Sequence, residues 1–402
     1  MNSGSGAEFF FWGSLVLLAY VYFGYPLVAA LRARFQPRPR LRARIEPSVS
    51  IVVVANNEAD RIAARIENLL ALDYPVHRFE IVVASDGSTD ATVECAWRYE
   101  LQGVKVRPFA ARRGKSAVLN AVVPKLRSDI VLFVDARQRF DRGTLRALVE
   151  NFADPTVGAV SGELVLTTAA GTAAAGQGTA FYWRYEKFIR SAEGRTDSTV
   201  GATGAIYAIR RELFEPIPDD TILDDVLIPL RIVRKGFRVL FEPGARAYDC
   251  ASATAHQEFV RKARTIAGTF QLFARERWLF NPRSNRLWFQ TISHKALRLA
   301  LPGLHAALLM ATFALVSQGI DRWALADQIY RCALAGQLMF YAAALIGYTQ
   351  RHARRRSFVF SVPCAISLLS WATVVGFVRF LTNRQQVTWE RVASPGVSSE
   401  AA

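Results

Sequence analysis

Four stretches without any Asp, Glu, Lys or Arg constrain this 402-residue chain more than any other feature. They run from Phe9 to Leu31, from Leu299 to Ile320, from Cys332 to Gln350 and from Ser357 to Val378. An α-helix needs about 20 predominantly apolar residues to cross a bilayer, and each stretch is near that length. The residues between Pro47 and about Asn285 are polar, so the pattern predicts a globular domain held between membrane segments.

The arginines that follow the first stretch predict how the chain is oriented. They are Arg32, Arg34, Arg38, Arg40, Arg42 and Arg44. No basic region precedes this stretch and no clear small-x-small site follows it, so we expect a signal anchor rather than a cleaved signal peptide. The positive-inside rule then places the arginine-rich side, and the globular domain with it, in the cytosol.

The direction of the last apolar stretch stays open. Leu299 to Ile320 would leave the cytosol and Cys332 to Gln350 would return to it, because the connector between them is close to neutral. A full span by Ser357 to Val378 would place the C-terminal end outside, whereas the arginines that follow favour the inside. A re-entrant or in-plane segment broken at Pro363 is the alternative.

The net charge of +16 raises the question of nucleic-acid binding. The arginines, however, cluster beside the apolar stretches, as between Arg351 and Arg356, where they suit anionic headgroups. We therefore expect membrane lipids, and no nucleic acid, among the partners. The four cysteines form no CxxC pair, which argues against a zinc site or a disulfide framework.

Strand-like and helix-like segments alternate through the polar region. Strands are predicted at Val49–Ala55, Glu80–Ala84, Val104–Pro108 and Ile130–Val134. Helices are predicted at Asp60–Leu72, Thr89–Tyr99, Lys115–Leu126 and Asp141–Phe152. This order predicts a parallel, doubly wound α/β sheet. Ligands bind such sheets at the carboxyl ends of the strands, where Glu58, Asp86 and Asp135 fall.

Five motifs in this region carry a resemblance to a known family. They are SIVVVANNE at residues 50–58, SDGSTD at 85–90, RGKSAVLN at 113–120, DAR at 135–137 and LDD at 223–225. In order and spacing the chain resembles the inverting family 2 glycosyltransferases from about Ser48 to Gly268. The membrane-embedded bacterial hyaluronan, cellulose, chitin and poly-N-acetylglucosamine synthases are similar in layout. The resemblance implies a GT-A fold, a Rossmann-like domain that binds nucleotide sugars, in the cytosol, plus α-helical transmembrane segments.

The resemblance also implies a role for each acid at the strand ends. Glu58 and Asp86 match the carboxylates that hold the base and ribose of the nucleotide, and Lys115 matches a basic residue beside them. Asp225 matches the catalytic base, with Asp224 before it. Each has a structural alternative: an Asx-turn for Asp86, a surface lysine at a helix start for Lys115, and N-cap acids for the aspartate pair.

The motif that begins at Asp135 departs from the family pattern, which reads Asp-x-Asp. There the acids hold Mg²⁺ or Mn²⁺ against the diphosphate, and Asp135 is our candidate metal ligand. Arg137 replaces the second acid. Either Asp135 and the diphosphate hold the metal alone, or Arg137 itself neutralises the diphosphate, or Arg137 forms an ion pair with a neighbouring acid. Gln138 could add a hydrogen bond in each case.

Two further segments match the acceptor side of the family. Gly204 lies in a run of small residues that would let a sugar approach the backbone. Processive members carry Gln-x-x-Arg-Trp, where this chain has Arg261, Arg264 and Thr265, followed by Gly268. Arg264 retains a contact to the diphosphate in this prediction, and Arg261 is kept as a substrate-binding candidate. The loss of the tryptophan argues against long-chain synthesis.

These segments divide the chain into five expected parts. Residues 1–46 form the first membrane helix and an arginine-rich linker, and residues 47–282 form the GT-A domain. Residues 283–298 form an interfacial amphipathic helix. Residues 299–381 form two spans plus a third span or a re-entrant segment, and residues 382–402 form a tail.

The resulting hypothesis is a multi-pass enzyme of the bacterial inner membrane. It is an inverting glycosyltransferase of the hexosyltransferase type that uses a nucleotide sugar, by family resemblance a UDP-sugar, to build a cell-surface or exported polysaccharide. One alternative is a non-processive transferase with a lipid-linked acceptor. Another is an inactive nucleotide-sugar-binding scaffold of an export complex. The expected partners are the donor, a glycan or lipid-linked acceptor and lipids, and export subunits stay undefined.

Overall fold

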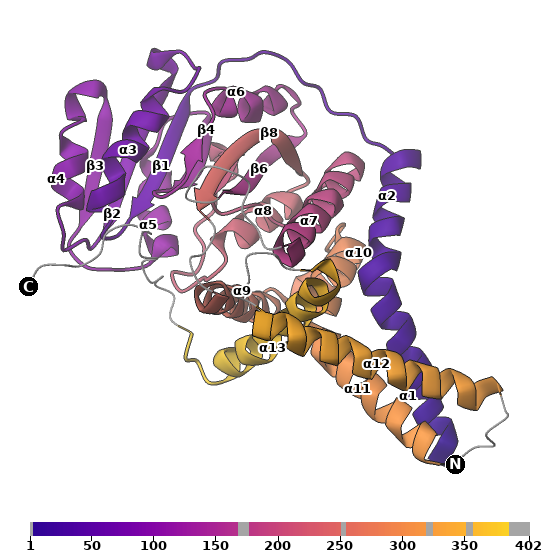
Figure 1. The fold of residues 1–402 in the computed structure, drawn as a ribbon. Coiled ribbons are helices and arrows are strands. Elements are labelled where there is room, and N and C mark those ends of the chain that lie inside the picture. The colour runs from indigo at the N-terminus through magenta and orange to yellow at the C-terminus, as the bar shows by residue number, and fades with distance from the viewer. Residues whose placement is uncertain (1–2, 168–176, 251–254, 319–324, 351–356, 386–402) are drawn as a thin grey trace, which may run out of the picture.

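The computed structural model describes residues 3–167, 177–250, 255–318, 325–350 and 357–385 of the chain. Figure 1 shows a helix-flanked sheet joined to an arm of long helices, with the N-terminus at the far end of that arm. The prediction of an α/β domain plus membrane-type helices is therefore confirmed.

The first half of the sheet has the predicted parallel architecture. Its strands are β1 (Val49–Ala55), β2 (Phe79–Asp86), β3 (Val104–Phe109) and β4 (Ile130–Asp135). The helices that follow them are α3 (Ala59–Leu70), α4 (Thr92–Trp97), α5 (Lys115–Val122) and α6 (Thr144–Val149). Two predicted helices end early, in the 3₁₀ turns η4 (Val123–Lys125) and η5 (Glu150–Ala153). The four strands pair in parallel in the order β3-β2-β1-β4.

The second half of the sheet is mixed, so the prediction of a wholly parallel sheet is wrong there. It contains β5 (Arg139–Phe140), β6 (Val157–Thr167), β7 (Ile206–Arg210) and β8 (Arg238–Cys250). Strand β7 lies between β4 and β6 and is antiparallel to both, and β8 is parallel to β6. Helix α7 (Gln177–Thr196) separates β6 from β7 in sequence. The alternation of strands and helices constrains how strands that are consecutive in sequence pair with one another. The pairings in this half join strands that are remote in sequence.

The remaining elements of the domain are two helices and four short turns. They are the helices α8 (Asp224–Arg234) and α9 (Ala255–Arg275) and the short turns η2 (Val76–Arg78), η3 (Glu100–Gln102), η6 (Arg211–Leu213) and η7 (Arg277–Phe280). Helices α8 and α9 carry the residues 224–225 and 261–264 that the sequence singled out.

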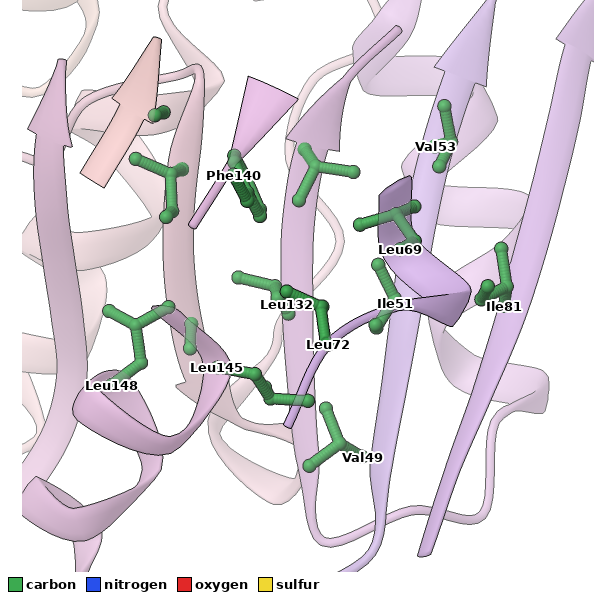
Figure 2. Close-up of a cluster of buried hydrophobic side chains, with 14 of the residues drawn as sticks. Val49, Ile51, Val53, Leu69, Leu72, Ile81, Leu132, Phe140, Leu145 and Leu148 are labelled. Carbon is green, nitrogen blue, oxygen red and sulfur yellow. The ribbon is translucent and has the colours of Figure 1, made fainter. Parts of the chain in front are cut away.

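The side chains of β1 divide between two cores, one on each face of the sheet. Val49, Ile51 and Val53 point to the layer under α3 and α6, which Figure 2 shows with Leu69, Leu72, Leu145 and Leu148. Val52 and Val54 point to the opposite layer, under α5 and α8. A strand buried on both faces reads as a continuous apolar run. Truncating such a side chain to alanine typically costs about 2–5 kcal/mol.

Within the part of the chain that the structure describes, four helices are long and apolar enough to cross a membrane. The first, Ser5–Phe35, joins α1 (Ser3–Ala19), the π turn η1 (Tyr20–Gly24) and α2 (Tyr25–Phe35). The second, Trp288–Ser317, joins α10 (Trp288–Gln290), the π turn η8 (Thr291–Ala296) and α11 (Leu297–Ser317). The others are α12 (Leu325–Thr349) and α13 (Phe358–Leu381).

The second helix differs from our expectation of a separate interfacial helix over residues 283–298. Residues from Trp288 onward form its first turns without a break. His294 is 1% exposed because it packs against α7, so these turns have one face buried on the domain.

Helix α13 touches both parts of the molecule. Its Gly376 packs against Ala263 and Ile266 of α9, where an added Cβ would lie 2.8 Å from the Ile266 side chain. At its other end, Phe360 packs against Gly347 of α12. This contact with the domain is compatible with the in-plane or re-entrant alternative. Of the arginines that follow the segment, Arg379 and Arg384 are described, whereas Arg391 lies outside the described residues.

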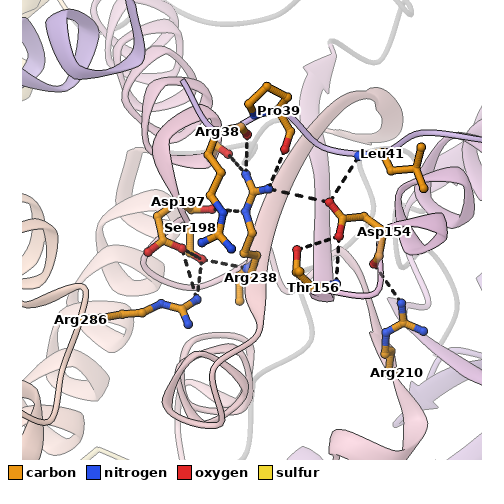
Figure 3. A network of polar contacts seen from close by, with 12 residues as sticks. Arg38, Pro39, Leu41, Asp154, Thr156, Asp197, Ser198, Arg210, Arg238 and Arg286 are labelled. Atoms are coloured by element: carbon orange, nitrogen blue, oxygen red, sulfur yellow. Dashed lines mark hydrogen bonds and ion pairs between the residues drawn. The ribbon is translucent and has the colours of Figure 1, made fainter. Parts of the chain in front are cut away.

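The arginine-rich linker is docked on the domain. Arg238, at the start of β8, is 1% exposed and donates to the carbonyl oxygens of Arg38, Pro39 and Asp197 (Figure 3). Two linker arginines pair with domain acids: Arg40 with Glu242 at 2.7 Å and Arg42 with Glu150 at 2.9 Å. These contacts tie the first membrane helix to the sheet.

Candidate active site

Strand ends and helix starts bring most of the predicted site residues to one edge of the sheet. Asp86 and Asp135 end β2 and β4, and Glu58 follows β1. Lys115 begins α5, and Asp224 and Asp225 begin α8. The carboxyl ends of β1, β2 and β4 meet because these strands are parallel and adjacent.

Lys115 links two of the acids. Its Nζ lies 3.1 Å from Asp135 Oδ1 and 3.7 Å from Asp224 Oδ2, and it also lies 3.5 Å from the carbonyl oxygen of Gly204. The side chain is 17% exposed, so the alternative of a surface lysine is wrong. Burial opposes its charge, but the carboxylates of Asp135 and Asp224 outweigh burial and raise its pKa.

Asp86 fixes the loop that presents Lys115. Its carboxylate is fully buried and accepts the backbone N–H groups of Arg113 at 2.6 Å and Gly114 at 2.9 Å. Gly87 has φ +63°, and a Cβ there would lie 2.4 Å from the backbone nitrogen of Arg112. A glycine is therefore required where this loop crosses the end of β2. The role of Asp86 in nucleotide binding stays a prediction.

Glu58 stands at the start of α3, where its carboxylate pairs with Arg61 at 3.3 Å. It is 7% exposed, and its charge is close enough to Arg137 to help raise the pKa of that guanidinium. Glu58 thus faces the same side of the site as Arg137. Its contact with a nucleotide base or ribose stays a prediction.

Arg137 forms an ion pair, as one of our three alternatives proposed. Its Nε lies 3.0 Å from Oδ2 of Asp249, and Gln138 donates to the same oxygen at 3.0 Å. Asp249 is 5% exposed. Burial opposes the charge of Asp135, but Lys115 and Arg137 lower the pKa of that carboxyl below its ordinary value.

The aspartate pair forms the first turn of α8 rather than its N-cap, which is Leu223. Asp224 is 6% exposed and accepts the hydroxyl of Tyr207 at 3.3 Å. Burial and the neighbouring charge of Asp224 raise the pKa of Asp225 to about 6. A carboxylate with such a pKa is ionised at neutral pH and is a stronger base than an ordinary aspartate.

Gly204 lies directly against the carboxylate of Asp225. A Cβ at Gly204 would come 2.8 Å from Oδ2 of Asp225. The backbone N–H of Ala202 donates to the carbonyl oxygen of Asp225 at 2.8 Å. The loop before β7 is therefore laid onto the start of α8, and only glycine fits at 204 without displacing the carboxylate.

Helix α9 brings Arg264 to the acids but leaves Arg261 on its own helix. Burial lowers the pKa of Arg264, whereas the charges of Asp224, Asp225 and Asp135 oppose that change. Arg261 pairs with Glu258, one turn earlier. Gly268 allows α9 to pack closely on Leu223, since a Cβ there would lie 2.7 Å from that side chain.

Three residues at the site had no individual role in the sequence analysis. Tyr207 lies within the run of small residues that includes Gly204, but only the fold points its hydroxyl at Asp224. Asp249 is distant from every motif. Arg65 of α3 stacks 4.0 Å from the centre of the Phe140 ring, and its charge faces Asp135. No sequence signal identified the last two.

The acids offer limited support for a metal. Among the described residues, no group of three or more His, Cys, Asp or Glu side chains could hold a metal ion. Mg²⁺ is commonly bound by one or two carboxylates together with substrate phosphates. Asp135 is therefore suited to bind a metal that arrives with a diphosphate. The described acids are not suited to bind a resident metal through protein ligands alone.

Comparison with known proteins places the chain beside enzymes that transfer sugars. Residues 50–217 match the model of glycosyl transferase family 2. A β-monoglucosyldiacylglycerol synthase of Synechocystis is 36% identical over 118 residues, which is 28% of this chain and 25% of that protein. A probable glycosyltransferase of Bacillus subtilis is 26% identical over 226 residues, or 53% of each chain.

A poly-β-1,6-N-acetyl-D-glucosamine synthase of Staphylococcus aureus is 22% identical over 265 residues, which is 65% of this chain and 63% of that protein. The matches thus span less than two thirds of the length of each of these relatives. Among solved structures, the mannosyltransferase PcManGT of Pyrobaculum calidifontis, in complex with GDP-Man and Mn²⁺, superimposes with a TM-score of 0.68 at 24% identity. That alignment covers 92% of this chain and 98% of the other, and it establishes a shared fold.

Proposed function

Because the chain carries a family 2 glycosyltransferase domain at residues 50–217, we propose that it is an inverting, membrane-embedded enzyme that transfers a hexose from a nucleotide sugar, with its site in the cytosol. The observation that carries this proposal is Asp225, a carboxylate of raised pKa. It is packed on Gly204 and faces a cationic group formed by Lys115 and Arg264. The site thus separates a base from a region suited to a diphosphate.

The reaction uses these two regions in one displacement. Asp225 accepts the proton of the acceptor hydroxyl while that oxygen attacks C1 of the donor sugar. The bond between C1 and the diphosphate oxygen breaks, and its electron pair leaves with the nucleoside diphosphate. That leaving group gains charge rather than a proton, and Lys115 and Arg264 stabilise the charge. Attack opposite the leaving group inverts C1.

Mg²⁺ or Mn²⁺ would be held by Asp135 and the donor diphosphate. The metal would add positive charge to the leaving group. The structure of PcManGT with GDP-Man and Mn²⁺ supports this part of the proposal, since that protein shares the fold. Because Lys115 already lies 3.1 Å from Asp135, the chain's own cations supply part of the same charge. We expect activity to fall, and not to vanish, in EDTA.

The acceptor is a growing glycan or a lipid-linked sugar. The poly-N-acetylglucosamine synthase and the glucosyldiacylglycerol synthase among the relatives support one class each. Thr265 favours the lipid-linked class. It is exposed on α9 and donates its hydroxyl back to the carbonyl of Arg261, so α9 offers no aromatic surface at this position for stacking a sugar. Thr265 therefore predicts that each acceptor receives a single sugar.

The test is donor turnover by the purified protein in lipid nanodiscs. A panel of UDP- and GDP-sugars, each with Mg²⁺, Mn²⁺ or EDTA, would identify the donor, and the product would be sized. Asp225→Asn should abolish transfer and leave donor binding intact. Asp220→Asn, a loop acid paired with Arg275, is the matched control and should retain activity. Transfer that survives Asp225→Asn would refute the assignment of the base.

A further inference from the structure

One face of α7 carries three charged residues that connect the membrane helices to the site. Glu186, Arg190 and Glu193 are spaced by four and three residues, so they share one side of the helix. Figure 1 shows α7 between the sheet and the helices α2 and α10. The side chains on this face contact the membrane helices on one side and the loop before β7 on the other.

The two glutamates hold the first two membrane helices. His294 lies between them, with Nδ1 2.8 Å from Glu193 and Nε2 3.2 Å from Glu186. Arg298 pairs with Glu186 at 2.7 Å, and the hydroxyl of Tyr25 donates to Glu193 at 2.5 Å. His294 is 1% exposed and Glu193 2%. Buried charges persist when they are paired and hydrogen-bonded in this way.

The membrane helices depart from regular α-geometry at the same level. Both have a π turn there, Tyr20–Gly24 in the first and Thr291–Ala296 in the second. The hydroxyls of Tyr20 and Ser293 lie 2.7 Å apart and join the two turns. π turns are rare and occur often at functional sites. Here they place His294 and Tyr25 against α7.

Arg190 connects the glutamates to the site. Its Nε lies 3.4 Å from Glu186, and its Nη1 donates to Oγ1 of Thr203 at 2.6 Å. The backbone N–H of Thr203 donates in turn to Ser161 at 2.9 Å. The next residue is Gly204, which contacts the carboxylate of Asp225. The guanidinium of Arg190 thus joins Glu186 to the loop 203–204, which lies against Asp225.

We propose that Arg190 is a positioning residue for the base Asp225, and that the second membrane helix holds it in place through Glu186 and His294. The inference rests on the proposed function. Arg190 fixes the loop 203–204 by its bond to Thr203, and its charge favours the ionised form of Asp225. The sugar-transfer site is thereby completed by the arrangement of the membrane helices.

The charge of Arg190 acts among several others that face Asp225. Burial and Asp224, on the same helix, raise the pKa of Asp225. Lys115 of α5 and Arg190 of α7 lower it, and Asp135 of β4 raises it. Arg264 of α9 and the neutral hydroxyl of Tyr207 of β7 complete the surroundings. Removing Arg190 takes away one of the opposing cations, so protonation of Asp225 becomes easier.

The experiment compares Arg190→Gln with wild type in nanodiscs across pH. We expect kcat to fall about 10- to 100-fold, the range for a misplaced catalytic group, with an unchanged donor KM. The acid limb of the kcat profile should move to higher pH. Arg190→Lys keeps the charge, so it should retain the wild-type acid limb and recover part of kcat. Lys187 lies three residues from Arg190 on α7 and pairs with Glu163 of β6; Lys187→Gln is therefore the matched control and should match wild type.

A second set of variants tests the membrane link. Glu186→Gln and His294→Gln should each lower kcat without changing the donor KM, and Glu186→Gln should add little in an Arg190→Gln background. An Arg190→Gln protein with a lower unfolding temperature but an unmoved acid limb would overturn the proposal, and so would full activity. The proposed function fails separately, if wild type turns over no donor or Asp225→Asn remains active.

Discussion

Replacing the base by its amide, Asp225→Asn, should stop catalysis and yet stabilise the fold. The carboxylate is buried beside Asp224, and this environment raises its pKa from 3.8 to about 6. One pKa unit corresponds to about 1.4 kcal/mol. Ionised Asp225 therefore costs the folded state about 3 kcal/mol at most. Asparagine has the same shape and removes that cost.

The size of this stabilisation depends on pH, whereas its sign does not. Below about pH 4 the aspartate is protonated in both the folded and the unfolded chain, so the variant gains nothing. Between about pH 4 and 6 the unfolded chain loses its proton first, and wild type loses stability as pH rises. Above about pH 6 the full cost of ionised Asp225 is present. The gain from Asp225→Asn is largest there.

Thermal unfolding in nanodiscs at pH 5 and pH 8 measures this difference. We expect the unfolding temperature of Asp225→Asn to exceed that of wild type by a few degrees at pH 8, and by less at pH 5. The control Asp220→Asn should show no such gain, because Arg275 lowers the pKa of Asp220 and the ionised form is favoured there. A variant that is less stable than wild type at pH 8 would refute the reasoning, whatever its activity.

Three other variants test single contacts. Gly204→Ala places a methyl group 2.8 Å from the Asp225 carboxylate. Steady-state kinetics should therefore show kcat reduced about 10- to 100-fold with unchanged donor affinity. A normal kcat would mean that the contact is irrelevant. Arg137→Gln removes the ion pair of the buried Asp249, which keeps its hydrogen bond from Gln138. Thermal unfolding should show a loss of about 1.5–3 kcal/mol that Asp249→Asn partly reverses. Arg238→Met removes the donor to four carbonyl oxygens, two of them in the linker, so limited proteolysis should cut residues 36–47 faster; an unchanged rate would argue against the docked linker.

The first half of the sheet was predictable because its signals are local. Each of β1 to β4 is a short apolar run followed by a helix, and right-handed crossovers restrict such units to a few parallel arrangements. The second half was not predictable in this way. Strand β8 pairs with β6, which lies about 80 residues earlier, and β7 is inserted between β4 and β6. No local pattern states which distant strands will be neighbours.

The residues of the candidate site likewise divide into those that the sequence identified and those that it could not identify. The family resemblance identified Asp135, Lys115 and Asp225, and the predicted elements placed them at strand ends or helix starts. It could not identify the partner of Arg137, since Asp249 is separated from it by 112 residues. Nor could it give the exposure of Lys115, which depends on how α5 packs under the site.

The sequence by itself determined which segments can enter a membrane, which strands form the first half of the sheet and which acids stand at their ends. These features depend on hydrophobicity and spacing within about 20 consecutive residues. The tertiary structure alone decided that the carboxyl of Asp225 has a raised pKa and that Arg190 bonds to both Thr203 and Glu186. Burial and electrostatic interaction depend on distances in space, and residues from α5, α7, α8 and α9 contribute to them together.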